Sequence, residues 1–464
     1  MILTAAALLG ALLLAGWVGG LLLPPAAAGG RSPGESFVAA LLLGMFAATA
    51  FVGALLLAGL TLHQAMGALL TATAGGTIVS GPRRQAWRRE WRRGWVRPSW
   101  RWYEGLLIAS LAEKIIFALR HFAHSPIYFS DAIDLWSGRG RAIFGGANWS
   151  LDPTSPAFLG LLDKKDYPLG IPIWRAMNAW FHQGWNDVIA RFDGVIFLLL
   201  LVGAVWLAAR RLTGSRPLAA AAAYLTVSFP LAAWHEVAGF ADLGVAAFVA
   251  AAAGALLRRE HFLAGLLAAG ACWIKNDPLY LFVPALGLAL AVMEGYPPLS
   301  WKAGLAALGR FGLGLLPIVP WVIYKKVHHL TYHLGAGVSW HEGALSLFGD
   351  AVLWGTTHGP WWFCALLAVA GGAGAMGRER EGRALLALFA AGFGLILFLF
   401  TATAAYPFLE NGQTVHRVMV QFSGVGALTL VYALALLAAP RREEAAANPP
   451  PPTHESTPPR EQEA

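Results

Sequence analysis

Long apolar runs without a charged residue are the feature that most constrains this chain. The run from Val195 to Ala209 shows no alternation of polar and apolar positions. Only helices and closed barrels satisfy their backbone hydrogen bonds in lipid, and barrel strands need a period of two. Because 57% of the 464 residues are hydrophobic and 13% are charged, a soluble fold would lack polar surface. We therefore expect an all-α, polytopic transmembrane helical bundle.

The apolar blocks set the number of expected spans. Thirteen blocks are about as long as a membrane-crossing helix or slightly shorter, at 2–23, 37–60, 64–81, 103–119, 190–209, 217–234, 241–257, 262–274, 278–293, 303–323, 359–376, 384–404 and 417–439. Block 262–274 is among the short ones, so we expect 11 to 13 spans.

Arginine clusters at the ends of apolar blocks predict the orientation. They lie at 83–101, 210–216, 258–259, 378–383 and 441–442, each an even number of spans from the next. The positive-inside rule makes these segments cytoplasmic. It places a main loop, 120–189, and a second loop, 324–358, on the extracytoplasmic face. The net charge of +8 is thereby explained by topology, and no nucleic-acid partner is expected.

The two ends of the chain differ from its middle. Trp87, Trp91 and Trp95 recur every four residues among arginines, which predicts an interfacial helix on an anionic leaflet. The first apolar block has no Lys or Arg before it, which favours an uncleaved first helix over a cleaved signal peptide. The predicted parts are N-terminal helices with the basic interfacial helix at 1–102, a transmembrane module at 103–439, and a disordered Pro- and Glu-rich cytoplasmic tail at 440–464.

The main loop holds the first candidate site residues. Asp131 and Asp134 come just after a predicted membrane exit, with Arg139 and Arg141 close behind. A carboxylate there can act as a general base for a hydroxyl or bind a hard divalent cation. An acid pair at a helix start, neutralised by the arginines, explains the pattern equally well. Asp166 lies in a proline-stiffened segment that could re-enter toward the membrane, although a simple turn is also compatible.

Further polar residues lie at other helix junctions on the same predicted face. Glu236 and Asp242 border an otherwise uncharged span, where ionisable groups usually mark a functional site and a helix cap is the alternative. Lys275 and Arg417 are suited to a phosphate, or else anchor the chain at the interface. His416 precedes Arg417. The histidines of the second loop lack a carboxylate or cysteine to complete a metal set.

Five motifs taken together resemble one known family. In chain order they are SDAIDLW, DYPLGIP, GFADLGVAAF, ACWIKNDPLYL and QTVHRVMV, between about residues 128 and 420. They resemble polytopic GT-C glycosyltransferases, in the branch similar to protein mannosyltransferases and the aminoarabinose transferase of lipid A. The sequence departs from the family pattern where Ala132 follows Asp131, and where Asp277 and Pro278 replace Glu-Gly, so we assign Asp277 no role.

The resemblance implies an inverting sugar transfer from a polyprenyl-phosphate-linked donor to an extracytoplasmic lipid, glycan or protein. Asp131 matches the essential loop acid of that family and would act as base or metal ligand. Lys275 and Arg417 would stabilise the departing phosphate. Asp242 and Glu236 would shape the sugar pocket or assist a divalent cation such as Mg²⁺ or Mn²⁺. Asp134, Asp166 and His416 are the other substrate-binding candidates. The expected location is the bacterial inner membrane, with the site facing the periplasm and short interfacial helices in the main loop.

Three other functions remain open from the sequence. They are a transporter or flippase of a lipid-linked substrate, an O-antigen polymerase or ligase, and a non-catalytic assembly subunit. A transporter usually places its ionisable groups at mid-membrane in paired broken helices. In this sequence the ionisable groups gather on one predicted face, which favours a transferase.

Overall fold

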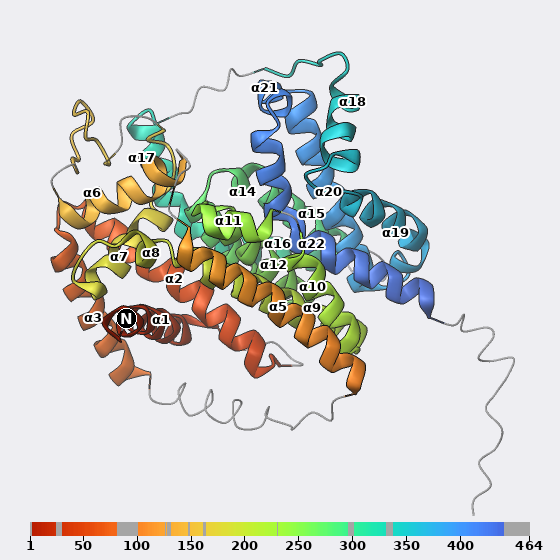
Figure 1. The fold of residues 1–464 in the computed structure, drawn as a ribbon, viewed down its shortest axis with the longest axis horizontal. Helices are drawn as coiled ribbons and strands as arrows, with labels where there is room; N and C mark the ends of the chain where they lie inside the picture. Colours follow the sequence, from red (N-terminus) through yellow and green to blue (C-terminus); the bar gives the residue numbers. More distant parts are fainter. Residues whose placement is uncertain are drawn as a thin grey trace, which may run out of the picture.

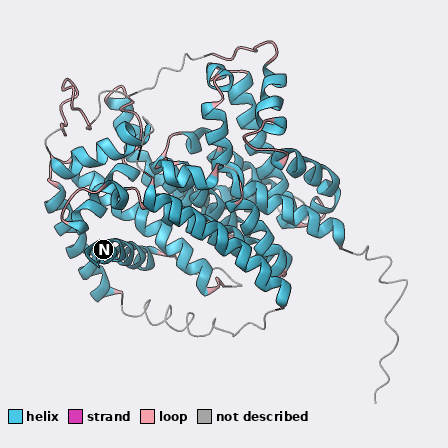
Figure 2. Cartoon of the chain, in the orientation of Figure 1, coloured by secondary structure: helices cyan, strands magenta, loops and turns pink. Residues whose placement is uncertain are grey.

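The computed structural model describes residues 2–24, 30–80, 101–125, 127, 131–146, 149–160, 164–229, 231–295, 301–330 and 337–439. These residues fold into helices joined by loops (Figures 1 and 2), and within them β structure is limited to two isolated bridges, Ser150–Phe158 and Val338–Thr403. The expected all-α polytopic bundle is confirmed. Residues 81–100, which contain most of the predicted basic interfacial helix, lie outside the described residues. The predicted tail, 440–464, lies outside them as well.

The elements of the first half run from the N-terminus to the start of the central helix. They are α1 (Ile2–Leu22), α2 (Pro33–Leu57), α3 (Leu62–Val79), α5 (Trp102–His124), the π-helix η1 (Asp131–Gly138), α6 (Arg139–Gly145), α7 (Gly170–His182), α8 (Asp187–Ala190), α9 (Asp193–Thr213), α10 (Arg216–Val227) and α11 (Ala232–Ala238).

The second half continues from that helix to the end of the bundle. Its elements are α12 (Asp242–Leu257), α13 (His261–Ile274), α14 (Asp277–Tyr280), α15 (Phe282–Gly295), α16 (Trp301–Leu315), the 3₁₀ helix η2 (Leu316–Ile318), α17 (Val319–Val327), α18 (Ala344–Gly349), the π-helix η3 (Asp350–Trp354), α19 (Trp361–Met376), α20 (Arg380–Thr401), α21 (Tyr406–Glu410) and α22 (Gln413–Ala438).

Within the described residues, each predicted apolar block lies mostly in helix, and the chain is an integral membrane protein. Within the described residues, six helical segments are long and apolar enough to cross a membrane by length and composition, at Pro33–Leu57, Asp187–Thr213, Asp277–Gly295, Trp301–Val327, Arg380–Thr401 and Thr414–Ala438. Shorter apolar helices such as α12, α13 and α19 accompany them. The number of 11 to 13 spans stays a prediction.

One block differs from its expected form. We expected a single helix over 217–234, but α10 ends at Val227 and a separate short helix, α11, begins at Ala232. The sequence has a proline at position 230, and a proline disfavours helical geometry in the residue before it and donates no backbone hydrogen bond. The break places α11 next to the start of α12.

Helix α12 is the centre of the bundle, and its label lies near those of α9 and α22 in the middle of Figure 1. All of its residues from Asp242 to Leu257 are buried, and it packs against α9, α13 and α22. Nine of them are Ala or Gly, small residues that let helix backbones approach closely in a membrane. The one charged residue of α12, Asp242, is therefore held deep among its neighbours.

A cluster of ion pairs lies at the opposite end of α12 from Asp242. Arg258 donates to Glu35 at the start of α2 (3.1 Å) and to Glu260 before α13 (3.0 Å). Glu260 also accepts from Arg31 at 2.6 Å. All four side chains are nearly inaccessible to solvent. These pairs join α2, α12 and α13 at the end of the bundle that the sequence predicts to be cytoplasmic.

Helices α1 and α2 cross with their backbones in contact. A Cβ placed at Gly44 would lie 1.7 Å from the Ala15 carbonyl oxygen, and one at Gly19 would lie 1.7 Å from the Ala40 carbonyl oxygen. No side chain other than hydrogen fits at either position. The pair therefore uses glycine on both helices for close approach, as membrane helix pairs commonly do.

We predict that Gly44→Ala lowers the stability of the folded protein by about 1–3 kcal/mol, because the two backbones must separate to admit the new methyl group. Thermal unfolding in detergent, followed by tryptophan fluorescence, measures the loss. Gly20→Ala is the matched control, since a Cβ at Gly20 meets no atom within 4 Å. Equal melting of the two variants would contradict the contact.

Candidate functional site

Arg417 joins two acidic residues that are far apart in the sequence. Its Nη1 donates to Asp131 Oδ2 at 2.6 Å, and its Nε donates to Asp242 Oδ2 at 3.2 Å. Asp131 is the first residue of η1, Asp242 is the first residue of α12, and Arg417 lies near the start of α22. The main loop, the central helix and the last helix therefore meet at one guanidinium group.

A lysine, a glutamine and a histidine also contact Asp242, whose side chain is fully buried, and the histidine is His235, with its Nδ1 3.3 Å from Asp242 Oδ2. Lys275, at the end of α13, pairs with Asp242 Oδ1 at 2.9 Å and with Asp277 Oδ2 at 2.8 Å. Gln421 lies one turn beyond Arg417 and donates to both Asp242 (2.7 Å) and Asp277 (3.0 Å). A buried carboxylate is costly unless it is paired and hydrogen-bonded, and Asp242 is both.

Asp131 is the more accessible of the two acids held by Arg417. Its side chain is 23% exposed, and Lys164 Nζ lies 2.9 Å from its Oδ1. Burial acts to raise the pKa of the Asp131 carboxyl, but the charges and hydrogen bonds of Arg417 and Lys164 outweigh burial and leave that pKa below its ordinary value. Asp131 is therefore ionised at neutral pH, as a general base must be.

These groups line a cavity of about 450 Å³ between the main loop and α14, α17 and α20 to α22. Five cationic and three acidic side chains face it, namely Lys164, Lys275, Lys325, Lys326 and Arg417 with Asp131, Asp166 and Asp277. The other wall is apolar and includes Leu281, Val322, Leu399, Phe400 and Phe408. The cationic side chains still outnumber the acidic ones when Asp242, which lies behind the cavity wall, is counted with them. The cavity is suited to a ligand with an anionic group and an apolar part.

A second polar group faces the same cavity. Asn276 donates to Asp166 Oδ2 at 2.8 Å and accepts from Lys325 Nζ at 2.8 Å. Tyr167, the next residue after Asp166, also lines the cavity. Burial raises the pKa of the Tyr167 hydroxyl, so it stays a neutral donor at physiological pH. The loop between α6 and α7 thus contributes both a carboxylate and a hydroxyl to the site.

Two fully buried arginines fix the loop that forms this wall. Arg139 donates to the carbonyl oxygens of Leu159 (2.7 Å) and Tyr167 (2.7 Å), which places the loop residues around Asp166. Arg175, on α7, forms a bidentate pair with Asp193 at 3.0 Å for each bond. The same guanidinium donates to Ser137 of η1 (2.7 Å) and to the carbonyl of Gly239 before α12 (2.8 Å). Arginine supports such geometry because its donors form a rigid planar fork.

The structure brings together most of the residues chosen from the sequence, but not all of them. Asp131, Asp166, Lys275 and Arg417 line the cavity, and Asp242 lies directly behind it. Asp134 is exposed and does not line the cavity. His416 faces His358, with 2.8 Å between its Nδ1 and His358 Nε2, also away from the lining. Glu236 belongs to α11, but its side chain lies outside the described part of the chain.

Sequence reasoning missed several residues of the site. We assigned Asp277 no role, yet it pairs with Lys275 and lines the cavity. Lys164 was not singled out, although it is one of two cations on Asp131. The signal that could have found Asp277 is its place two residues after Lys275, in a turn between buried helices. Lys164 offered no such signal, because it lies 33 positions from its partner in an irregular loop.

The expected divalent cation was assigned to Asp131 and Asp242. Both carboxylates are paired with cationic side chains, and Asp242 additionally accepts from Gln421. Hard cations need several free oxygen ligands. In the described portion of the chain, no group of three or more His, Cys, Asp or Glu residues could hold a metal ion. This set of side chains does not fit Mg²⁺ or Mn²⁺.

Comparison with known proteins finds a solved structure with a similar fold. No protein family model matches this chain, and a search of curated proteins found no significant match. The crystal structure of ArnT from Cupriavidus metallidurans bound to undecaprenyl phosphate is similar, with a TM-score of 0.52 and 15% sequence identity. The match covers 74% of this chain and 62% of that chain, which is less than two thirds of its length. At this identity the likeness supports a GT-C-like membrane fold.

We predict that Arg175→Met lowers stability by about 3–5 kcal/mol, because it leaves the Asp193 carboxylate buried without a partner. Adding Asp193→Asn should restore part of that loss, since the unpaired charge is then removed. Thermal unfolding in detergent compares the three proteins. Identical melting of the single and double variants would show that Asp193 is not the source of the cost.

Proposed function

We propose that this protein is a membrane glycosyltransferase that moves a sugar from a polyprenyl-phosphate donor to an acceptor hydroxyl. The observation that carries the proposal is the shared cavity of Asp131, Arg417 and Lys275, which sets an ionised carboxylate beside cations and an apolar wall. The fold likeness adds support, because the similar ArnT structure contains undecaprenyl phosphate. The motif order along the sequence points to the same class of enzyme.

In the proposed reaction, the acceptor oxygen attacks the anomeric carbon of the sugar. The hydroxyl proton passes to the Asp131 carboxylate as the new C–O bond forms. The bond between the anomeric carbon and the phosphate oxygen breaks, and its electron pair leaves with the lipid phosphate. Arg417 and Lys275 stabilise the charge that develops on the phosphate, as prearranged donors do in a site shielded from water. Attack from the face opposite the leaving group inverts the anomeric carbon.

The ion pairs of the site suggest how donor binding prepares the base. Arg417 and Lys164 together occupy both oxygens of Asp131. A donor phosphate would compete for Arg417, because phosphate and carboxylate favour the same guanidinium geometry. Asp131 would then be free to accept a hydrogen bond from the acceptor. Asp242, which also accepts from Arg417 and is itself held by Gln421, would keep Arg417 in place during this exchange.

The remaining assignments follow from this proposal. The apolar cavity wall would hold the first part of the polyprenyl chain, and Asp166 with Tyr167 would contact the sugar. The arginine clusters would be cytoplasmic, so the site would face the exterior of a bacterial inner membrane. Asp134, Glu236 and His416 remain predicted contacts of the acceptor or donor.

Replacing Asp131 by Asn should abolish sugar transfer, because the amide cannot accept the acceptor proton at neutral pH. The assay supplies membranes with polyprenyl-phosphate sugars of different identity and detects labelled product by mass spectrometry. Asp152→Asn is the matched control, since Asp152 is an exposed acid on the same loop whose carboxylate bonds to Thr154. Full activity in the Asp131 variant would end the proposal, whereas lipid movement across the bilayer without any transfer would indicate a flippase.

The pH dependence offers an independent test. Lys164 helps to hold the pKa of Asp131 low, so Lys164→Met should raise that pKa. Asp131 would then become protonated at a higher pH, and the acidic limb of the kcat/KM profile should move to higher pH. Lys165→Met is the control, because Lys165 lies over the Phe158 ring and does not pair with Asp131. An unmoved acidic limb would contradict the role of Asp131 as the base.

A further inference from the structure

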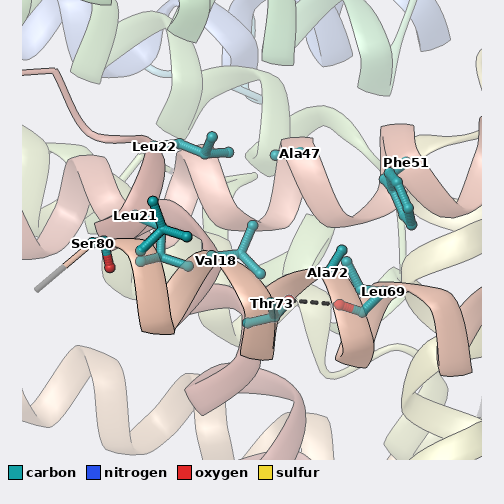
Figure 3. A pocket seen from close by; sticks show the side chains of 11 residues that line it. Val18, Leu21, Leu22, Ala47, Phe51, Leu69, Ala72, Thr73 and Ser80 are labelled. Atoms are coloured by element: carbon teal, nitrogen blue, oxygen red, sulfur yellow. Dashed lines mark hydrogen bonds between the residues drawn. The ribbon is translucent and has the colours of Figure 1, made fainter.

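The charged side chains that can recognise an anion lie around Arg417 and not at the larger cavity between α1, α2 and α3. That cavity has a volume of about 710 Å³, and its lining is apolar except for Thr73 and Ser80. Figure 3 shows the lining, with the hydroxyl of Thr73 bonded to the Leu69 carbonyl of its own helix (2.7 Å). Ser80 likewise donates to the Thr77 carbonyl (3.4 Å). No charged residue of the described chain lines this cavity, so anion recognition depends on Arg417 and its surroundings.

The carboxylate of Asp242 is surrounded by four nitrogen atoms of neighbouring side chains. Lys275 Nζ (2.9 Å) and Gln421 Nε2 (2.7 Å) lie against its Oδ1. Arg417 Nε (3.2 Å) and His235 Nδ1 (3.3 Å) lie against its Oδ2. An ionised carboxylate offers about four lone-pair sites in total. Both oxygens of Asp242 are therefore fully occupied, and a second nitrogen of Arg417 finds no site on them.

Arg417 is consequently held by one nitrogen, unlike Arg175. Arg175 forms two bonds with Asp193, both of 3.0 Å, and both of these side chains are fully buried. Arg417 donates to Asp242 through Nε alone, and its side chain is 16% exposed. Its Nη1 extends to Asp131, and within the described residues its Nη2 makes no hydrogen bond. The two Nη groups of Arg417 are thus open to an anion in the cavity.

A neutral histidine provides the fourth nitrogen at Asp242. The side chain of His235, on α11, is fully buried, and its Nδ1 approaches Asp242 at a distance slightly longer than an ordinary hydrogen bond. Its Nε2 has no hydrogen-bond partner in the described part of the chain. A protonated ring would bury an N–H at Nε2 without an acceptor, which is costly. The neutral ring with its hydrogen on Nδ1 is therefore favoured, and it donates to Asp242 without adding charge.

The turn between α11 and α12 provides a second contact with Arg417. Phe240 lies in this turn, and its ring centroid is 4.1 Å from the guanidinium carbon of Arg417. The face of an aromatic ring attracts a guanidinium group placed over it. The ring of His235 lies beside that of Phe240, with 5.2 Å between the ring centroids. The turn before α12 therefore restrains Arg417 at its face through Phe240 and at its Nε through Asp242.

We propose that His235 is a positioning residue for Arg417, which it keeps directed at the phosphate of the donor lipid; the inference rests on the proposed function. By occupying Oδ2 of Asp242, His235 prevents Arg417 from turning into the two-bond arrangement of Arg175. Without this donor, the vacant site on Oδ2 attracts a second nitrogen of Arg417 and withdraws it from the cavity. His235 does not line the cavity, so it acts through Arg417 and not by contact with the donor.

Binding of undecaprenyl phosphate to the purified protein tests the proposal without any transfer reaction. His235→Asn keeps an amide donor near the position of Nδ1, His235→Gln moves the amide toward the position of Nε2, and His235→Leu removes the donor. The Asn variant should bind within about twofold of the natural affinity, whereas the Gln and Leu variants should bind roughly tenfold more weakly, the effect of losing one hydrogen bond to a charged group. Equal affinity of the three variants would overturn the proposal. If the Leu variant does not fold, the comparison of Asn with Gln decides.

A histidine at the other end of α13 from Lys275 gives a matched control. His261 is also buried, and its Nε2 lies 3.3 Å from a carboxylate oxygen of Glu294. The pair is the same in chemistry and distance as that of His235 and Asp242, but His261 does not line the cavity. His261→Leu should therefore leave the affinity for undecaprenyl phosphate unchanged. An equal loss in His261→Leu and His235→Leu would show a general effect of removing a buried histidine and would overturn the proposal.

A double-mutant cycle tests whether His235 acts through Arg417. Arg417→Lys should itself weaken the binding of undecaprenyl phosphate, because lysine lacks the planar fork of donors. Adding His235→Leu to Arg417→Lys should then cause little further loss, since coupled residues are not additive. Additive losses would overturn the proposal. Absence of binding by the natural protein would overturn it together with the phosphate-binding role of Arg417, whereas binding without sugar transfer would refute the glycosyltransferase alone.

Discussion

The buried carboxylate of Asp242 must be neutralised, and the residues that neutralise it also form the candidate site. Arg417 and Lys275 satisfy this requirement from α22 and the end of α13, and each extends to a second acid at the cavity wall. Asp131 and Asp277 are thereby fixed in place by the same two cations. Asp242 is buried at the start of a central helix of small residues, so it needs cationic partners. Those partners, Arg417 and Lys275, also supply the positive charge of the cavity.

The sequence was sufficient to predict the helices and the face on which the polar residues gather. The reason is that lipid permits few backbone arrangements, so apolar length translates directly into helix. It also singled out Asp131, Asp242, Lys275 and Arg417, which the structure brings together, because an ionisable residue at a helix end in an apolar chain is rare and costly. It overlooked Lys164 and Asp277, since their importance depends on three-dimensional pairing. Asp134 was chosen for its nearness to Asp131, but its side chain is exposed.

The main loop is held in shape by buried arginine side chains in addition to apolar residues, such as Trp136 and Phe158, that pack in the core. Arg139 donates hydrogen bonds to backbone carbonyls of the loop. Arg175 donates hydrogen bonds to η1, α9 and the turn before α12. An irregular segment cannot satisfy its carbonyl groups internally, so a buried guanidinium with five donors replaces the missing secondary structure. The loop can thus hold Asp166 and Tyr167 in fixed positions at a membrane surface.

The ion pairs at both ends of α12 have a mechanical consequence. At one end, Asp242 pairs with Lys275 after α13 and Arg417 of α22. At the other end, Arg258 pairs with Glu35 of α2 and with Glu260. A shift along the helix axis by even one turn, about 5.4 Å, would break both sets of pairs at once. The ion pairs therefore fix the position of helix α12 along its own axis. A carrier that alternates between two faces needs its halves to slide or rock, and this pinning opposes such movement.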